Sequence, residues 1–137
     1  MNLRKYFEHK EIGWTEIGEQ FTRYQIFKSR WINVYLHELW APAWHPECHD
    51  HPWGFLAILL WRGYLERIGT KDYRRWPGSI LVRSATFAHN VITPYGKSWS
   101  LILTGPRSRQ WGFKPCDRPT STTTPWHEYR DAQKEQM

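Results

Sequence analysis

The stretch WHPECHDHPWGFLAILLW (44–61) decides the fold that this sequence predicts. Its second half, FLAILLW (55–61), is apolar on both faces, and the neighbouring Pro52 and Gly63 favour a β-strand there over a buried helix. A strand that is apolar on both faces needs cover on both sides. We therefore expect a barrel interior against one face, and the N-terminal segment or a second copy of the chain, as a homodimer, against the other.

Short segments rich in aromatic and β-branched residues continue this pattern in both directions. Turn signals such as Pro77-Gly78 and the segment 94–97 separate them. About eight short strands with frequent turns predict an all-β, antiparallel barrel or sandwich. Besides 55–61, the expected strands are 21–27, 31–40, 63–68, 79–83, 90–93 and 98–104.

The two ends of the chain differ from this central region. Around residues 3–12 the apolar spacing predicts a short amphipathic N-terminal helix. From residue 114 onward, three prolines and a run of Ser and Thr predict an irregular C-terminal tail (114–137), which we expect to wrap the surface through Trp126 and Tyr129. The core of the single domain 1–137 is thus expected within residues 21–113.

Length and composition exclude several classes of protein. The chain has 137 residues, of which 40% are hydrophobic, so it is neither a disordered tail nor a collagen-like chain nor a coiled coil. No apolar run approaches the ~18 residues of a membrane span, and the first residues show no secretory signal. Two cysteines, Cys48 and Cys116, make no disulfide framework, so we expect a reducing, cytoplasmic location.

A formal charge of +6 and ten tryptophans raise the question of nucleic-acid binding. The basic residues are scattered, and Glu66 and Asp72 interrupt the densest basic stretch. We therefore favour an aromatic core with a mildly basic surface, and a small molecule rather than nucleic acid as partner. Burial of most of the tryptophans would exclude single-strand binding.

The loop before 55–61 carries the densest set of chemical groups. His49 and His51 form a His-x-His pair, and alternate residues of an extended segment point to the same side. His89, which follows the strand 79–83, is the candidate third ligand. Three neutral imidazoles suit Fe(II), Zn, Ni, Cu or Mn, and they leave positions open for water or substrate.

Other interpretations of these residues remain open. The histidines are alternatively ordinary surface or hydrogen-bonded residues. Cys48 and His45 would form a local structural zinc site together with His49 and His51. The sequence has no G-x-S-x-G elbow, P-loop or G-x-G-x-x-G motif to indicate hydrolase or nucleotide-binding chemistry.

The residues around these histidines resemble the two sequence motifs of the cupin superfamily. The first motif reads G-x5-H-x-H-x3–4-E-x6-G; His49 and His51 match its histidines, and Gly63 matches its closing glycine. The second reads G-x5-P-x-G-x2-H-x3-N, in which Gly78 and His89 match. Ser84, Thr86 and Thr93 replace its proline, second glycine and asparagine. The resemblance implies a cupin-type β-barrel (a double-stranded β-helix or jelly roll) with a metal site of His49, His51 and His89.

One motif residue is missing: with a four-residue spacer, Leu56 stands where the family has Glu. Without that carboxylate, a divalent ion on three neutral imidazoles keeps its full charge and attracts an anionic ligand more strongly. The ligand set is similar to that of the three-histidine thiol dioxygenases, which favours Fe(II) and an oxygenase over Zn, Ni or Mn and an isomerase or hydrolase. More closely, segments such as HDHPWGF (49–55) and LILTGPRSRQWGF (101–113) resemble small uncharacterised cupin proteins of bacteria and their phages, which implies the fold and no particular activity.

Several residues are candidates for the surroundings of the metal. Asp50, between two ligands, should face away from it. Strands that could line the barrel carry Glu66, Tyr35 and His37, each either a partner of a ligand or an ordinary core or surface residue. A non-catalytic protein that binds a small ligand, a nucleotide or a sugar is the alternative to an enzyme. The candidate substrate-binding residues are Trp53, Tyr64, Arg83, Arg107 and Arg109.

Overall fold

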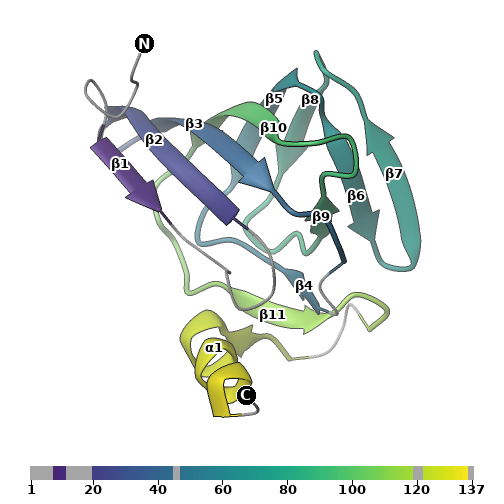
Figure 1. Cartoon of the computed structure of the whole chain (residues 1–137). Helices are drawn as coiled ribbons and strands as arrows, with labels where there is room; N and C mark the ends of the chain where they lie inside the picture. The colour runs from purple at the N-terminus through teal and green to yellow at the C-terminus, as the bar shows by residue number, and fades with distance from the viewer. Residues whose placement is uncertain (1–7, 12–19, 45–46, 119–121, 136–137) are drawn as a thin grey trace.

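The structure is a computed structural model that describes residues 8–11, 20–44, 47–118 and 122–135. Its architecture is mostly antiparallel β-sheet (Figure 1). The largest sheet has six strands in the order β1-β2-β3-β10-β5-β8. These strands are β1 (Glu8–Glu11), β2 (Gln20–Lys28), β3 (Asn33–Trp40), β10 (Ser98–Thr104), β5 (Phe55–Trp61) and β8 (Ile80–Arg83).

Two smaller sheets complete the fold. One has the order β7-β6-β9 and faces the six-stranded sheet, and the other has the order β12-β11-β4 and lies at the lower end in Figure 1. Among the described residues the three sheets do not join into one closed, hydrogen-bonded barrel. The elements are β4 (Glu47–His49), β6 (Tyr64–Ile68), β7 (Lys71–Arg75), β9 (Asn90–Ile92), β11 (Gly112–Pro115), β12 (Thr124–Pro125) and α1 (Trp126–Glu135).

The core lies between the six-stranded sheet and the β7-β6-β9 sheet. Alternate residues of each strand face it: Ala57 and Leu59 on β5 meet Ile102 on β10 and Tyr35 on β3. Tyr64 enters the same cluster from the opposite sheet. The apolar run 55–61 therefore does form a strand with one face in the core, as predicted.

The outer face of the six-stranded sheet is apolar and partly exposed. Ile80 and Val82 on the edge strand β8 are 63% and 70% exposed, and Leu60 is 48% exposed. Burial against a second copy of the chain stays a prediction.

The helix expected around residues 3–12 is wrong where the structure describes it. Glu8–Glu11 form the edge strand β1, which pairs antiparallel with residues 22–25 of β2; the rest of the expected helix lies outside the described residues. A helical apolar spacing is a weak preference, and the unpaired edge of β2 offers a backbone ladder that outweighs it.

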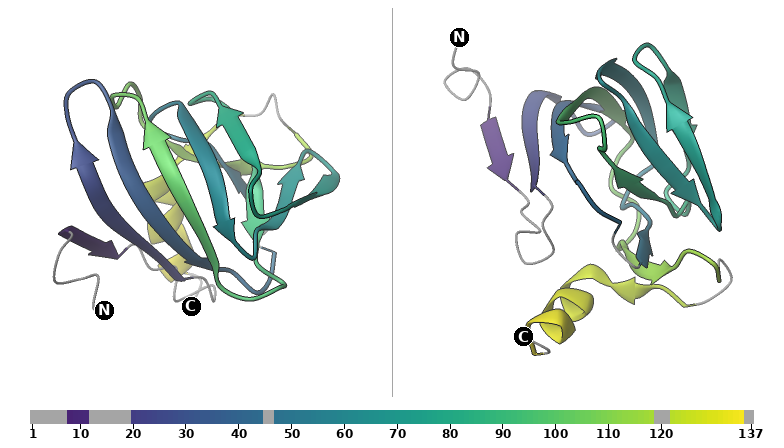
Figure 2. Two further views of the ribbon diagram at one scale, coloured as in Figure 1. Left: turned by 90° about the horizontal axis from the view of Figure 1, so that it is seen from above. Right: turned by 45° about the vertical axis from the view of Figure 1, so that its right-hand side comes forward.

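The irregular tail expected from 114 onward is also corrected. Phe113 pairs with Thr124 across β11 and β12, and Trp126–Glu135 form the helix α1. Trp126 stacks on Trp111, and the ring centroid of Tyr129 lies 4.3 Å from that of Phe113. These two aromatic residues pack the helix against the end of the molecule that carries β4 and β11 (Figure 2). The other residues of α1 are mostly polar, so the sequence did not indicate a helix here.

Both motif glycines lie in turns that favour glycine. Gly63 and Gly78 have φ angles of +64° and +91°, in the region that side chains disfavour. At Gly63 a Cβ atom would also collide with the backbone oxygen of Arg75. Gly63 thus allows the turn after β5, and Gly78 allows the turn before β8.

Cys48 and Cys116 form a disulfide that ties β4 to the segment after β11. The inference of a reducing compartment rested on the absence of a disulfide framework, so the disulfide removes its support, and the cytoplasmic location stays a prediction. No helix among the described residues has the length and hydropathy that crossing a membrane requires.

The disulfide should contribute strongly to stability, because it closes a loop with a sequence separation of 68 residues. The chain-entropy model gives roughly 4 kcal/mol for a loop of this length. Reduction, or the double substitution Cys48→Ser and Cys116→Ser, should lower the free energy of unfolding by about that amount in urea titrations. Dithiothreitol should leave the double variant unchanged. An equal urea midpoint for oxidised and reduced wild type would show that the bond does not form.

Candidate metal centre

A short backbone ladder brings His49 and His89 face to face. His49 ends β4, and His89 precedes β9. The two residues form an antiparallel bridge in which each backbone N–H donates to the other residue's carbonyl oxygen, at 2.8 and 3.0 Å. Paired residues of a ladder point their side chains to the same face, so both imidazoles enter the interior together.

A second set of hydrogen bonds holds His51 in place. Its backbone N–H donates to the carbonyl oxygen of Ala85 at 3.0 Å. Arg109 donates to the carbonyl oxygens of both His51 and Ala85, and it pairs with the buried carboxylate of Asp50 at 2.9 Å. Asp50 also accepts the backbone N–H of Gly112 at 2.8 Å. As predicted, Asp50 turns away from the histidines and fixes the loop that carries them.

The three predicted ligands converge. The ring centroids of His49, His51 and His89 lie 4.8 to 5.1 Å apart, and each residue offers one nitrogen within 4.8 Å of the others. His89 is buried, and the other two are partly buried. Among the described residues this group contains no carboxylate. It could hold a metal ion on three imidazole nitrogens.

Glu66 on β6 determines which nitrogen of the His89 ring carries the proton. Its carboxylate is fully buried and lies 2.6 Å from His89 Nδ1. Burial alone would raise the pKa of Glu66, but hydrogen bonds from His89 and Arg83 outweigh it and lower that pKa to about 2. The ionised carboxylate must accept, so Nδ1–H of His89 donates. The lone pair of Nε2 is then free for a metal ion, as in many carboxylate–histidine–metal arrangements.

Two arginines hold this carboxylate in place. Arg83 and Arg75 approach Glu66 Oε1 at 2.7 and 2.9 Å. A buried carboxylate with three hydrogen-bonding partners is stabilised, whereas an isolated one would be costly. Glu66 was one of several candidate partners in the sequence, and the structure shows what it binds.

His51 supplies an independent test of whether the cluster fits a cation. Its Nδ1 atom is buried and has no hydrogen-bond partner. Burial, followed by the charges of His89 and His49, holds the pKa of His51 well below its ordinary value. A neutral imidazole with an unpartnered nitrogen is costly in a protein interior. A bound cation would use lone pairs of these imidazole nitrogens, so the residues fit a metal ion.

Phe55, rather than Leu56, approaches the histidines from β5. The ring of Phe55 lies 4.6 Å from that of His51 and 6.3 Å from that of His89. Leu56 pairs with Val82 and Leu103, and alternation along β5 turns it toward the outer face. Phe55 follows His51 by four residues, and this shared parity along the chain is the sequence signal that places both on one side.

Further aromatic rings surround the histidines. Phe87 approaches His89 at 5.6 Å, while Trp111 and Phe113 approach His49 at 6.3 and 6.4 Å. Phe87 comes from the loop before β9, Trp111 immediately precedes β11, and Phe113 belongs to β11. No sequence signal linked the last two to the site, because a long-range strand pairing brings them there.

The predicted substrate-binding residues are in different environments. Tyr64 is buried in the core, and burial followed by the charge of Glu66 raises its pKa above the ordinary value. Arg83 and Arg109 already bind Glu66 and Asp50. Arg107 is exposed, and Trp53 stacks on Tyr35 at 6.2 Å. Their roles toward a substrate stay predictions.

The structural-zinc alternative is wrong, because Cys48 is bonded to Cys116 and its sulfur is not available as a thiolate ligand. His45, the further ligand in that alternative, lies outside the described residues.

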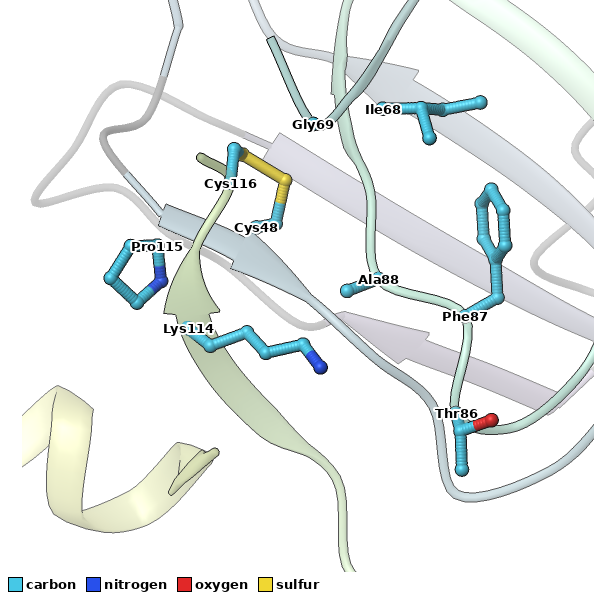
Figure 3. A pocket seen from close by; sticks show the side chains of 9 residues that line it. All are labelled: Cys48, Ile68, Gly69, Thr86, Phe87, Ala88, Lys114, Pro115 and Cys116. Atoms are coloured by element: carbon cyan, nitrogen blue, oxygen red, sulfur yellow. A yellow bond between two sulfur atoms is a disulfide. The ribbon is translucent and has the colours of Figure 1, made fainter. Parts of the chain in front are cut away.

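A pocket of about 260 Å³ lies beside this disulfide (Figure 3). Its lining includes Cys48 and Ala88, the residues that precede His49 and His89, and none of the three histidines. Phe87, whose ring approaches that of His89, also lines this pocket.

Comparisons with solved structures find the same architecture. A cupin-superfamily sugar phosphate isomerase from Silicibacter pomeroyi matches with a TM-score of 0.61 and 12% identity, over 83% of this chain and 80% of that one. The chain has the cupin fold. The Clostridium difficile EutQ protein (TM-score 0.59, 8% identity, 70% and 75% coverage) and an RmlC-like cupin from Shewanella frigidimarina (0.59, 11%, 77% and 88%) share it. No family model and no curated protein matches the sequence.

Burial of most of the tryptophans would have excluded binding of single-stranded nucleic acid, and the described tryptophans do not meet this condition. Among the described residues, Trp31, Trp40, Trp61 and Trp76 are exposed, and the other tryptophans are partly buried. Arg74 stacks on Trp76 with its Cζ 4.1 Å from the ring centroid. The preference for a small molecule over nucleic acid therefore stays a prediction.

The low pKa of Glu66 predicts acid sensitivity. The unfolded chain protonates this carboxyl near pH 4.5, whereas the folded chain does so only near pH 2. Acid therefore favours unfolding between these values, and the free energy of unfolding should fall by up to about 1.4 kcal/mol per pH unit. Urea titrations from pH 6 to 2 should show this slope in wild type and in the exposed-site control Glu128→Gln.

Glu66→Gln should lack this contribution to the slope. It should also lower stability by about 3 kcal/mol at pH 7, because it removes the charge between two arginines. A variant as stable as wild type, with the same acid slope, would contradict the assigned charge of Glu66.

Proposed function

We propose that the protein is a metal-dependent enzyme that acts on a small polar or anionic substrate, with His49, His51 and His89 as the ligands of a single divalent transition metal ion. One observation carries the proposal: the three imidazoles converge, and a buried, ionised carboxylate orients the ring of His89. Ordinary core histidines need no such arrangement.

The chain's own residues prepare this site in three ways. Glu66 holds the proton on His89 Nδ1, which fixes the ring's tautomer and orientation. Arg109 and Asp50 fix the loop between the other two ligands. Phe55 and Phe87 place apolar rings, and no carboxylate, beside the histidines.

The charge balance favours an anion. The three imidazoles contribute no charge when neutral, and Glu66 stands against two arginines. Fe(II) would supply oxygenase chemistry with dioxygen as co-substrate, whereas Zn, Ni or Mn would supply Lewis-acid chemistry for isomerisation or hydrolysis. The absence of a carboxylate from the ligand group favours Fe(II) and an oxygenase in this proposal, by its similarity to three-histidine dioxygenases.

The aromatic surroundings favour one alternative, a non-catalytic protein that binds a small ligand. Phe55, Phe87 and Trp111 around the histidines would serve a binding cavity as well as a reaction site. Turnover, rather than metal content, separates the two functions.

Metal content tests the ligand assignment. Elemental analysis of tag-free protein should find about one transition metal ion per chain in wild type. His49→Ala, His51→Ala and His89→Ala should each lose most of it, and Glu66→Gln should weaken affinity by about 10- to 100-fold. His127→Ala, on α1, is the matched control and should retain the ion. Equal metal in all variants would refute the triad.

Oxygen consumption tests the reaction class. Fe(II)-loaded protein with candidate thiols should consume dioxygen in an electrode assay, and His89→Ala should not. Consumption equal to that of free Fe(II) would reject the oxygenase and leave the isomerase, hydrolase and binding alternatives.

A further inference from the structure

The guanidinium group of Arg23, on β2, lacks the partner that other arginines at the barrel interior have. Arg75 and Arg83 bind Glu66, and Arg109 binds Asp50. Among the described residues, no carboxylate lies within ion-pair distance of Arg23. A partly buried cation without a counter-charge is costly.

Aromatic rings surround this cation. Its Cζ atom lies 4.6 Å from the ring centroid of Tyr35, 5.0 Å from that of Trp53 and 5.5 Å from that of Phe21. Burial lowers the pKa of Arg23, although the charge of Tyr35 opposes the shift. An arginine nevertheless stays protonated in proteins, so the positive charge persists inside an aromatic enclosure.

His37 orients the guanidinium group. It is the cross-strand partner of Arg23, and its Nε2 accepts the Nε–H of Arg23 at 3.2 Å. Burial, followed by the charge of Arg23, holds the pKa of His37 well below its ordinary value, so its ring is neutral and can accept. This hydrogen bond uses only the Nε–H of Arg23. The two terminal amino groups are the part of a guanidinium group that binds a carboxylate or phosphate through paired hydrogen bonds.

Arg23 lies on the core-facing side of the six-stranded sheet, where its guanidinium group contacts the ring of Tyr35. Tyr35 belongs to the core cluster against which Phe55 packs, and Phe55 contacts His51. Trp53, which lies under the guanidinium group, follows His51 by two residues. A small molecule in this interior could therefore meet both groups.

We propose that Arg23 is the anion-binding residue of the site, where its terminal amino groups bind the carboxylate or phosphate of a small substrate whose reacting end lies at His49, His51 and His89. The position of the reacting end rests on the proposed function, whereas binding of an oxyanion at Arg23 requires no metal. The substrate class is thus a small molecule with a terminal oxyanion, and Arg23 determines that specificity.

Titration of two simple oxyanions tests the assignment. Inorganic phosphate and acetate are added to the full chain at constant ionic strength, and binding is followed by calorimetry and by tryptophan fluorescence. At least one should bind wild type, and the stronger identifies the preferred oxyanion. Arg23→Met should weaken this binding by about 10- to 100-fold, and Arg23→Lys, which keeps the charge but not the fork, should weaken it less.

Matched variants keep the test specific. Arg30→Met removes an equal charge from the turn that follows β2, where Arg30 lies on Trp31, and it should bind the anion as wild type does. His89→Ala should keep anion binding while it loses metal, and Arg23→Met should keep metal. Circular dichroism checks that each variant is folded, and Arg23→Lys carries the comparison if Arg23→Met does not fold.

The proposal would be overturned if wild type bound neither anion, if Arg23→Met bound the anion equally well, or if Arg30→Met lost binding to the same extent. Loss in His89→Ala with retention in Arg23→Met would place the anion at the histidines and overturn it as well. Wild type without metal but with Arg23-dependent anion binding would refute the proposed function and leave the anion site in place.

Discussion

One buried carboxylate links the two facing sheets, which no backbone ladder joins among the described residues. Glu66 on β6 binds Arg75 on β7, Arg83 on β8 and His89 before β9. β8 belongs to the six-stranded sheet, and the other segments belong to or lead into the facing sheet. Where the described strands leave the barrel open, this polar cluster holds the two sheets together. The same cluster orients a proposed metal ligand, so stability and site geometry share one set of bonds.

The charged side chains of the interior carry more positive than negative charge. Asp50 balances Arg109, but Glu66 faces two arginines and Arg23 faces aromatic rings. The histidine cluster adds no negative charge. An interior of this kind is poorly suited to a cationic ligand and well suited to one that brings a carboxylate or phosphate.

Much of this could be predicted from local sequence patterns. The strands expected at 55–61 and 98–104 match β5 and β10, and the His-x-His pair with His89 does converge. Local patterns did not indicate β4, which reads as a loop rich in proline and histidine and becomes a strand by pairing with β11. The disulfide, the partners of Glu66 and the aromatic neighbours of His49 all depend on contacts between distant residues. The motif spacing aligned Leu56 with the missing glutamate, but spacing alone does not show that Phe55 is the residue that faces the histidines.

The convergence of the three histidines depends on the register of the backbone bridge between His49 and His89. Side chains alternate along an extended chain, so a slip of one residue in this pairing would turn one imidazole outward and bring Ala88 or Asn90 into its place. An insertion or deletion between Arg83 and His89 that shifted this register would erase the donor set and leave the core of Tyr35, Leu59 and Ile102 in place. In this chain, the donor set thus depends on the pairing of two backbones as much as on the presence of three histidines.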